Sequence, residues 1–214
     1  MPSDKAVVHV IDDDEAMRES LAFLLNAVGM EVRTYESATA FLAVASKVGA
    51  GCVITDVRMP ELSGVDLLRR LRELKLGIPV IVITGHGDVP LAVEAMKFGA
   101  LDFLEKPFDD ELLLASVRSA LDKLNQDQRR QAERSEIEGR LAALSNRERD
   151  VLEGLVSGQA NKQIAYDLGI SPRTIEIYRA NLMTKMQAAS LSDLVRMALI
   201  AGILGPGSDR PKAS

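Results

Sequence analysis

Acidic, hydroxyl and ammonium side chains recur in the first half of the sequence, each at the point where a short apolar run ends. Residues 12–14, all Asp, follow the first run, and Asp56 follows the third. Thr84 ends the fourth run, and Lys106 comes shortly after the fifth. A fold that brings these ends together places at least three carboxylates, one hydroxyl and one ammonium in a single crevice.

Such a cluster requires a cation, because carboxylates ~4–5 Å apart repel by roughly 3–4 kcal/mol per pair at an effective dielectric constant near 20. Oxygen donors without His or Cys favour a hard ion, and few protein ligands with several waters suit Mg²⁺. A carboxylate left over for chemistry is a candidate phosphoryl acceptor. Lys106 would then neutralise charge on the transferred group, and the Thr84 hydroxyl would donate to it.

Each of these residues has a simpler interpretation when taken alone. An Asp run after a strand commonly forms a turn or caps a helix, Thr84 could be an ordinary turn residue, and Lys106 could be a solvated lysine. The repeated position at the ends of successive apolar runs is what favours a shared site. A phosphate-binding loop of the Gly-x-x-x-x-Gly-Lys-Ser/Thr type is absent from the sequence, which argues against a nucleotide hydrolase.

The elements that must position these residues alternate between strand and helix. Amphipathic stretches at 16–28, 65–74 and 89–98 separate the apolar runs, and Gly29, Gly77 and Gly99 stand where helices should end. The predicted strands are Ala6–Ile11, Val32–Tyr35, Cys52–Thr55, Pro79–Thr84 and Leu101–Leu104. This alternation predicts an α/β doubly wound, five-stranded parallel sheet, in which ligands bind beyond the carboxyl ends of the strands.

The second half of the chain has a helical pattern only. A helix from Asp110 to Leu124 runs into a polar stretch that favours a solvated helical linker. Ser145 and Glu148 form a capping-box signature before a helix at 146–156. Further helices are predicted at 161–168, at 172–186 and from Ser190 or Ser192 to about residue 202. The predicted division is 1–124, a linker at 125–140, a four-helix domain at 141–204 and a disordered tail at 205–214.

The helix at 172–186 presents a face that can read base edges. Ile175, Tyr178, Arg179, Leu182 and Met186 form its inward stripe on a helical wheel. An exposed apolar side chain can contact the methyl group of thymine, Asn can hydrogen-bond to adenine, and Glu can accept a hydrogen bond from cytosine. The predicted base-reading residues are Arg173, Thr174, Glu176, Ile177, Ala180, Asn181 and Thr184, and those predicted to contact phosphates are Asn161, Lys162 and Lys185. A helical hairpin without DNA-binding function is the alternative.

Composition restricts the class of protein. The net charge of −5 divides unevenly, since the first 124 residues carry 20 acidic and 13 basic side chains, and the remaining 90 carry 11 and 13. The single cysteine, Cys52, excludes an internal disulfide and indicates a reducing compartment. No signal peptide or membrane span is predicted. We expect a cytoplasmic protein with no membrane partner, an inert buried Cys52, and structural roles for His9 and His86.

The motif residues of the first half resemble the receiver domain of two-component response regulators. They are Asp12-Asp13, Asp56 within Thr-Asp-Val-Arg-Met-Pro, Ser63-Gly64, Thr84 and Lys106-Pro107. The resemblance implies that Asp56 accepts a phosphoryl group from a sensor histidine kinase. It implies Mg²⁺ bound by Asp13, Asp56 and the Arg58 carbonyl, with Asp12 acting through water. It also implies a cis Lys106–Pro107 bond, switch roles for Thr84, Lys106 and Phe103, and a dimer face at Val93, Lys97 and Phe103.

The second half is similar to the LuxR-type DNA-binding domain over about residues 141–203. It departs from that pattern at Tyr178, where His is common, and at Glu176, where a basic residue is frequent. Together the halves resemble the LuxR/FixJ/NarL branch of response regulators, and in particular its nitrogen-fixation regulators. This implies a phosphorylation-dependent homodimer that binds promoter DNA, works with RNA polymerase and activates transcription. The self-phosphorylation and dephosphorylation of Asp56 would be its only catalysis.

Two other classes of protein remain open from the residues. A haloacid dehalogenase-type phosphatase also uses Asp and Mg²⁺, but it requires Asp-x-Asp followed by Thr or Val, whereas Asp14 is followed by Glu15 and Ala16. An interaction adaptor would bind protein rather than DNA through its second half. Turnover of an aryl phosphate and salt-sensitive DNA binding would distinguish these classes.

Overall fold

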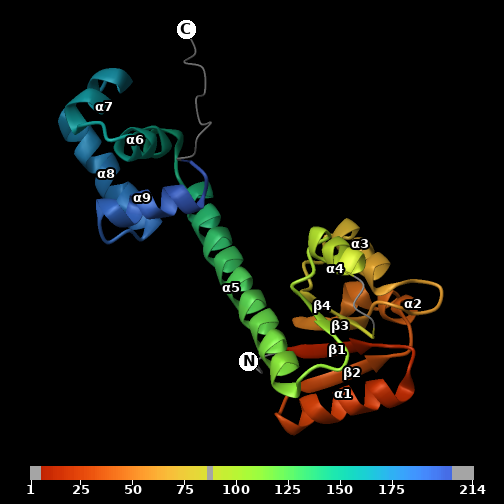
Figure 1. Ribbon diagram of the computed structural model, residues 1–214. Helices are drawn as coiled ribbons and strands as arrows, with labels where there is room; N and C mark the ends of the chain where they lie inside the picture. Colours follow the sequence, from red (N-terminus) through yellow and green to blue (C-terminus); the bar gives the residue numbers. More distant parts are fainter. Residues whose placement is uncertain (1–5, 86–88, 204–214) are drawn as a thin grey trace. The chain divides into compact units, whose positions relative to one another are not determined.

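The computed structural model describes residues 6–85 and 89–203, without the Val89 side chain. The chain forms two compact units, which divide between Asp127 and Gln128. The first unit is the predicted α/β domain, and the second is all-helical (Figure 1). The fold class expected from the sequence is therefore confirmed.

A five-stranded parallel sheet in the order β2-β1-β3-β4-β5 forms the centre of the first unit. Its inner strands β1, β3 and β4 are apolar and rich in β-branched residues and are almost wholly buried, as inner parallel strands require, whereas the edge strands β2 and β5 are partly exposed. The strands are β1 (Val7–Ile11), β2 (Glu31–Tyr35), β3 (Gly51–Asp56), β4 (Val80–Thr84) and β5 (Asp102–Glu105). The helical segments up to residue 97 are α1 (Glu15–Ala27), α2 (Ala38–Leu42), η1 (Ala45–Lys47), α3 (Gly64–Glu73) and α4 (Val89–Lys97).

Helices cover the two faces of this sheet in two groups (Figure 1). Leu21 and Leu25 of α1 pack with Leu113 and Val117 of α5 (Asp110–Ala142) in the core on one face. Phe41 and residues of α3 and α4 fill the core on the other face. Both cores are apolar, so the sheet is fixed between them and the carboxyl ends of its strands are held in register.

The polar residues singled out in the sequence lie at one end of the sheet. Asp56 and Thr84 are the last residues of β3 and β4. Asp12 directly follows β1, and Lys106 directly follows β5. Because all four strands are parallel neighbours, these side chains share the carboxyl edge, as predicted.

The second unit has four helices after the end of α5, within the described residues. They are α6 (Asn146–Val156), α7 (Asn161–Leu168), α8 (Pro172–Met186) and α9 (Leu191–Ile200). Ile137 and Leu141 of α5 pack with Leu152, Ile175 and Leu182 in a single apolar core. Gly169 ends α7 in the left-handed conformation with φ 65°, and Ser171 caps α8 only two residues later. This tight turn produces the predicted helix-turn-helix.

The element boundaries agree closely with the sequence pattern, with a few differences. α2 and η1 were not expected, because segments of five and three residues are too short to show a helical period. Residues 125–140 are helical, and they continue α5 without a break. Positive φ values at Gly29 and Gly99 confirm two predicted helix ends, but α3 ends at Glu73 and the left-handed residue after it is Lys75, with φ 54°, rather than Gly77. The predicted tail at 205–214 and His86 lie outside the described residues.

Candidate phosphoryl-acceptor site and DNA-binding face

The Asp56 carboxylate is nearly enclosed and is held by two donors. Its side chain is 10% exposed, and Lys106 Nζ lies 2.8 Å from Oδ1. The backbone N–H of Arg58 donates to Oδ2 over 2.6 Å. Each donor binds one carboxylate oxygen, so the orientation of the group is fixed at the edge of the sheet.

Lys106 also contacts a second carboxylate. Its Nζ lies 3.2 Å from Oδ2 of Asp12, whose other oxygen accepts the N–H of Asp14 over 2.9 Å. Burial raises the pKa of Asp12 above its ordinary value, against the opposing effects of the Asp14 N–H and the Lys106 ammonium. Burial alone would lower the pKa of Lys106, but its bonds to Asp56 and Asp12 outweigh burial and raise it. One ammonium therefore serves two buried acids.

The segment after β3 approaches Asp56 closely. The Gly64 N–H donates to the carbonyl of Val57 over 3.0 Å. A Cβ at Gly64 would lie 2.2 Å from the backbone oxygen of Asp56, so only glycine fits there. Ser63 caps α3 by accepting the N–H of Asp66. These contacts explain why a Ser-Gly pair follows the acceptor Asp and how it fixes the backbone beside the site.

The predicted switch residues occupy different environments. Thr84 is fully buried at the end of β4, and its carbonyl accepts the Lys106 N–H over 2.7 Å. Phe103 is half-buried in β5 and packs against the core beneath α3 and α4. The Lys106–Pro107 bond is cis, as the resemblance implied. Thr84 and Lys106 are thus neighbours across β4 and β5.

The oxygen donors at this edge fit a hard divalent ion. Asp12 and Asp56 are buried while Asp13 is exposed, and none of the residues predicted to bind metal supplies nitrogen or sulfur. Among the described residues, no three His, Cys, Asp or Glu side chains gather closely enough to hold a metal by themselves. The expected cluster of three carboxylates is therefore not found among the described residues, where the buried pair Asp12 and Asp56 shares Lys106 and Asp13 is exposed.

Other residues that the sequence analysis considered have structural roles. Asp14 caps α1 by accepting the N–H groups of Ala16 and Met17, as predicted. Burial raises the pKa of the Cys52 thiol to about 12, which keeps it protonated and inert. Burial also lowers the pKa of His9 to about 4, and its Nδ1 lies 3.2 Å from the Tyr35 hydroxyl. His9 is therefore a neutral core residue.

The α4 surface predicted to form a dimer face is partly apolar. Val93 and Met96 are 48% and 51% exposed, and Lys97 is also exposed. Phe103 is less accessible than these residues. Met96 was missed by the sequence analysis, although its position three residues after Val93 on a helix was a usable signal.

The face of α8 predicted to read DNA is largely exposed. Ile175, Leu182 and Met186 are buried, and Tyr178 and Arg179 are half-buried. Ile177 is 58% exposed, which is unusual for a large apolar side chain on a helix that buries its other side. The remaining predicted base-reading residues are exposed, apart from the half-buried Thr174: Arg173, Glu176, Ala180, Asn181 and Thr184. Lys162 is exposed and Asn161 is half-buried at the start of α7.

Lys185 was predicted to contact phosphate, but the structure gives it a partner within the protein. Its Nζ lies 2.7 Å from Oε2 of Glu148, whose side chain is 5% exposed. Glu148 also completes the predicted capping box with Ser145. The Lys185 ammonium, together with the Ser145 bonds, lowers the pKa of Glu148 to about 2. The sequence identified the capping box, but the ion pair joins residues 37 positions apart and has no local signal.

Both units match known protein families. The family model of the response regulator receiver domain matches residues 8–118, which contain all four carboxyl-edge residues. The model of the luxR family of bacterial regulatory proteins matches residues 142–198. The chain belongs to the response regulators. Response regulators with this pair of domains are transcription regulators rather than conventional enzymes.

Relatives of this response regulator cover nearly its whole length. The transcriptional regulatory protein FixJ of Azorhizobium caulinodans is 60% identical over 94% of this chain and 95% of its own. FixJ of Rhizobium meliloti is 55% identical over 93% of this chain and 97% of its own. The crystal structure of full-length FixJ from B. japonicum has a TM-score of 0.60 at 53% identity, covering 95% of this chain and 100% of that chain. Response regulator StyR has a TM-score of 0.80 at 38% identity, covering 91% and 98%.

In residues 6–85 and 89–203, no helix combines the length and the apolar character needed to cross a bilayer.

Proposed function

We propose that this response regulator is a transcription factor switched on by phosphorylation of Asp56. The phosphoryl donor is a phosphohistidine of a sensor kinase, and the reversible acceptor chemistry at Asp56 is the only reaction of the chain. The observation that carries the proposal is the single Lys106 ammonium between Asp56 and Asp12, 2.8 Å and 3.2 Å away. Within the described residues, Lys106 is the cation bonded to both carboxylates, and the Arg18 guanidinium binds the Asp12 carbonyl, so a divalent ion would offset the negative charge that remains at this edge.

In the proposed transfer, a carboxylate oxygen of Asp56 attacks phosphorus in line with the phosphohistidine. The new O–P bond forms as the P–N bond breaks, and the electron pair of the P–N bond returns to the imidazole, which takes up a proton. The product is an acyl phosphate on Asp56. Lys106 remains beside the transferred group as a cation, and the Thr84 hydroxyl donates to one phosphoryl oxygen.

A magnesium ion is part of the proposal. Asp13, Asp56 and the Arg58 carbonyl would hold it, and Asp12 would bind one of its waters. When bound, the ion would neutralise charge on the phosphoryl oxygens during transfer. Lys106 and the Arg58 N–H then keep Asp56 oriented while phosphorus approaches.

The change at Asp56 is transmitted to α4 and β5. Phosphorylation adds about one to two negative charges to the site, which draws Thr84 and Lys106 toward the phosphoryl group. Phe103 then turns inward, and the surface at Val93 and Lys97 becomes a dimer interface. The exposed Val93 and Met96 support this surface, because they offer apolar area for a second copy to cover.

The dimer places two α8 helices on promoter DNA. Two-fold related recognition helices contact half-sites about 34 Å apart, whereas a single copy of so weakly basic a domain binds weakly. Bound in the cytoplasm at such a promoter, the dimer works with RNA polymerase and activates transcription. The similarity to FixJ supports genes of nitrogen fixation as the target.

Footprinting of the full chain with and without acetyl phosphate tests the function. We expect protection of two half-sites only when acetyl phosphate and Mg²⁺ are present, and no protection by Asp56→Asn. Arg173→Ala and Asn181→Ala should each weaken the footprint by about 5- to 100-fold, because a base contact contributes about 1–3 kcal/mol. Arg147→Ala, at an exposed arginine of α6, is the control. Equal protection by Asp56→Asn and the unchanged protein would contradict the proposal.

A further inference from the structure

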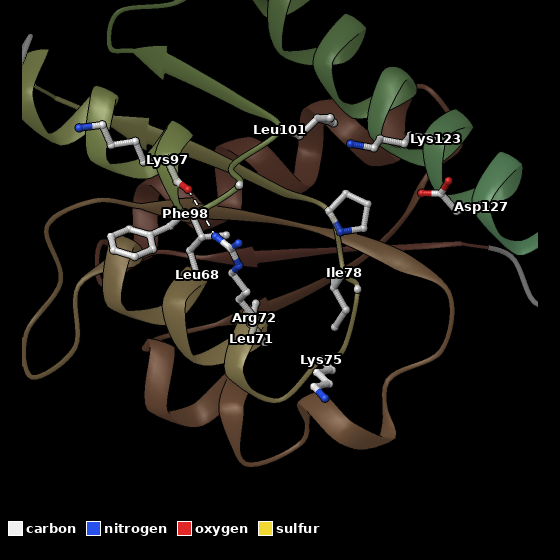
Figure 2. Close-up of a pocket in the computed structure, with 13 residues that line it drawn as sticks. Leu68, Leu71, Arg72, Lys75, Ile78, Lys97, Phe98, Leu101, Lys123 and Asp127 are labelled. Carbon is white, nitrogen blue, oxygen red and sulfur yellow. Dashed lines mark hydrogen bonds between the residues drawn. The ribbon is translucent and has the colours of Figure 1, made fainter. Parts of the chain in front are cut away.

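A cavity of about 550 Å³ lies between α3, α4 and α5 in the first unit, in the size range of small-molecule sites (Figure 2). Its lining contains residues near the amino ends of β4 and β5, such as Pro79 and Leu101. The carboxyl-edge residues Asp12, Asp56, Thr84 and Lys106 do not line it. It is therefore separate from the phosphoryl-acceptor site.

The floor of this cavity is apolar. Leu68 and Leu71 of α3 are buried there, and Ile78, Phe98 and Leu101 are half-buried. Leu68, Leu71, Ile78 and Leu101 come from three separate segments around one opening, whereas the Phe98 ring packs against the Arg69 guanidinium, 4.6 Å from the ring centroid. Such a floor favours a ligand with an apolar body.

The rim of the cavity is basic, although the unit around it is acidic. Arg72, Lys75, Lys97 and Lys123 line it, against one acidic lining residue in the described part of the chain, Asp127. Residues 1–124 as a whole carry 20 acidic and 13 basic side chains. The cavity lining is therefore basic although the domain as a whole is acidic, and this charge favours an anionic ligand.

Two of these cations reach the cavity from different helices. Figure 2 shows Arg72 rising from α3 and Lys123 extending from α5, while Lys97 points away from them. Arg72 makes one long hydrogen bond, from Nη1 to the Lys97 carbonyl at 3.4 Å, so most of its donors remain for a ligand. Across residues 6–85 and 89–203, the Lys123 and Lys75 ammonium groups have no hydrogen bond or ion pair.

We propose that this cavity binds a small organic anion with an apolar body, such as a medium-chain carboxylate. The apolar body covers Leu68, Ile78 and Leu101, and the anionic group lies between Arg72 and Lys123. This site goes beyond the proposed phosphorylation switch and does not depend on it.

Calorimetric titration of the full chain with decanoate, below its aggregation concentration, tests this site. We expect saturable binding with one site per chain. Decanol has the same alkyl chain without the charge and should bind at least about tenfold more weakly, since a charge-assisted hydrogen bond contributes about 1.5–3 kcal/mol. Equal binding of decanol, or no saturable binding of decanoate, would overturn the proposal.

Variants of the rim provide the matched comparison. Arg72→Gln and Lys123→Gln change exposed side chains and should each weaken decanoate binding by about tenfold. Lys47→Gln, at an exposed lysine of η1 that does not line the cavity, should leave it unchanged. Equal affinity of Arg72→Gln, Lys123→Gln and Lys47→Gln would contradict the assignment.

Discussion

Each unit of this protein contains a buried carboxylate joined to a lysine from a distant part of the chain. In the first unit, Asp56 contacts Lys106 over 2.8 Å, with 50 positions between them. In the second unit, Glu148 contacts Lys185 over 2.7 Å, with 37 positions between them. The side chains of the two acids are 10% and 5% exposed. By burial and pairing alone, these two sites are nearly identical.

The two pairs differ in their balance of charge. Lys106 is shared by Asp56 and Asp12, so two acids have one ammonium. Among the described residues, Glu148 is the one carboxylate that Lys185 contacts, although the ammonium also donates to the Ala143 carbonyl, and Glu148 also accepts from the Ser145 N–H and hydroxyl. Burial accordingly raises the pKa of Asp12, whereas the bonds to Glu148 lower its pKa to about 2. The proposed function assigns this surplus of acid to cation and phosphoryl chemistry, whereas it assigns a structural role to the Glu148–Lys185 pair.

The largest expected difference between the two pairs is in phosphoryl acceptance. Asp56→Asn should abolish labelling by acetyl phosphate, because an amide oxygen cannot form the acyl phosphate. Glu148→Gln should accept phosphoryl as well as the unchanged protein does. A phosphate-affinity gel separates the phosphorylated fraction of each variant and so measures its phosphoryl acceptance. Loss of labelling in both variants would contradict the proposed difference between the two carboxylates.

The two lysines should differ in their effect on the switch. Lys106→Met removes the cation that follows the phosphoryl group, so we expect phosphorylation-driven dimerisation to weaken by about 10- to 100-fold, the equivalent of ~1.5–3 kcal/mol. Lys185→Met should leave the dimerisation constant of the phosphorylated chain unchanged. Sedimentation equilibrium in acetyl phosphate measures both, and an equal loss in the two variants would contradict the assigned roles.

For the free energy of unfolding, we expect the substitution of Glu148 to have the larger effect and the substitution of Asp56 the smaller one. Glu148→Ala removes the capping box and leaves Lys185 without its partner, so we expect a loss of ~1–3 kcal/mol in the unfolding free energy of the second unit. Asp56→Asn leaves Asp12 with Lys106 to itself and relieves repulsion, so the first unit should be equally or more stable. Calorimetric melting distinguishes the units, and a large destabilisation by Asp56→Asn would show that Asp56 is a structural residue.

The smallest expected effect is a dependence of stability on pH. The folded pKa of Glu148 is about 2, below its ordinary value of 4.5. The unfolded chain therefore binds this proton more readily, and the stabilisation is complete above pH 4.5 and is lost as the pH falls toward 2. The melting-temperature difference between the unchanged protein and Glu148→Gln should be constant above that range and shrink within it. A melting-temperature difference that grows as the pH falls would contradict a lowered pKa of Glu148 in the folded state.

Local patterns in the sequence predicted most of the fold. The inner strands are runs of β-branched residues such as Val80–Thr84. The α6 helix begins at the capping box that Ser145 and Glu148 predicted. The α2 helix has five residues and no complete apolar period, so it gave no signal. The end of α8 was predicted at residue 186, where the structure has it, although the left-handed residue that follows is Gln187, with φ 55°, and not a glycine.

The sequence predicted which residues belong to the sites, but it did not predict which of their side chains bond to one another. Asp12, Asp56, Thr84 and Lys106 could be selected because each stands at the end of an apolar run. One ammonium can bond both acids only because four strands, β1, β3, β4 and β5, pair in register, and no local pattern in the sequence contains that pairing. For the same reason, the bond from Lys185 to Glu148 was missed, and Lys185 was assigned to DNA alone.

The most direct test of the central claim is to identify the residue that carries the phosphoryl group. Borohydride reduction of the phosphorylated full chain converts an aspartyl phosphate to homoserine, and peptide mass spectrometry then locates it. We expect homoserine at position 56 alone, and none in protein that has not been exposed to acetyl phosphate and Mg²⁺. Homoserine at position 12 or 13, or its absence from position 56 in fully phosphorylated protein, would contradict the account.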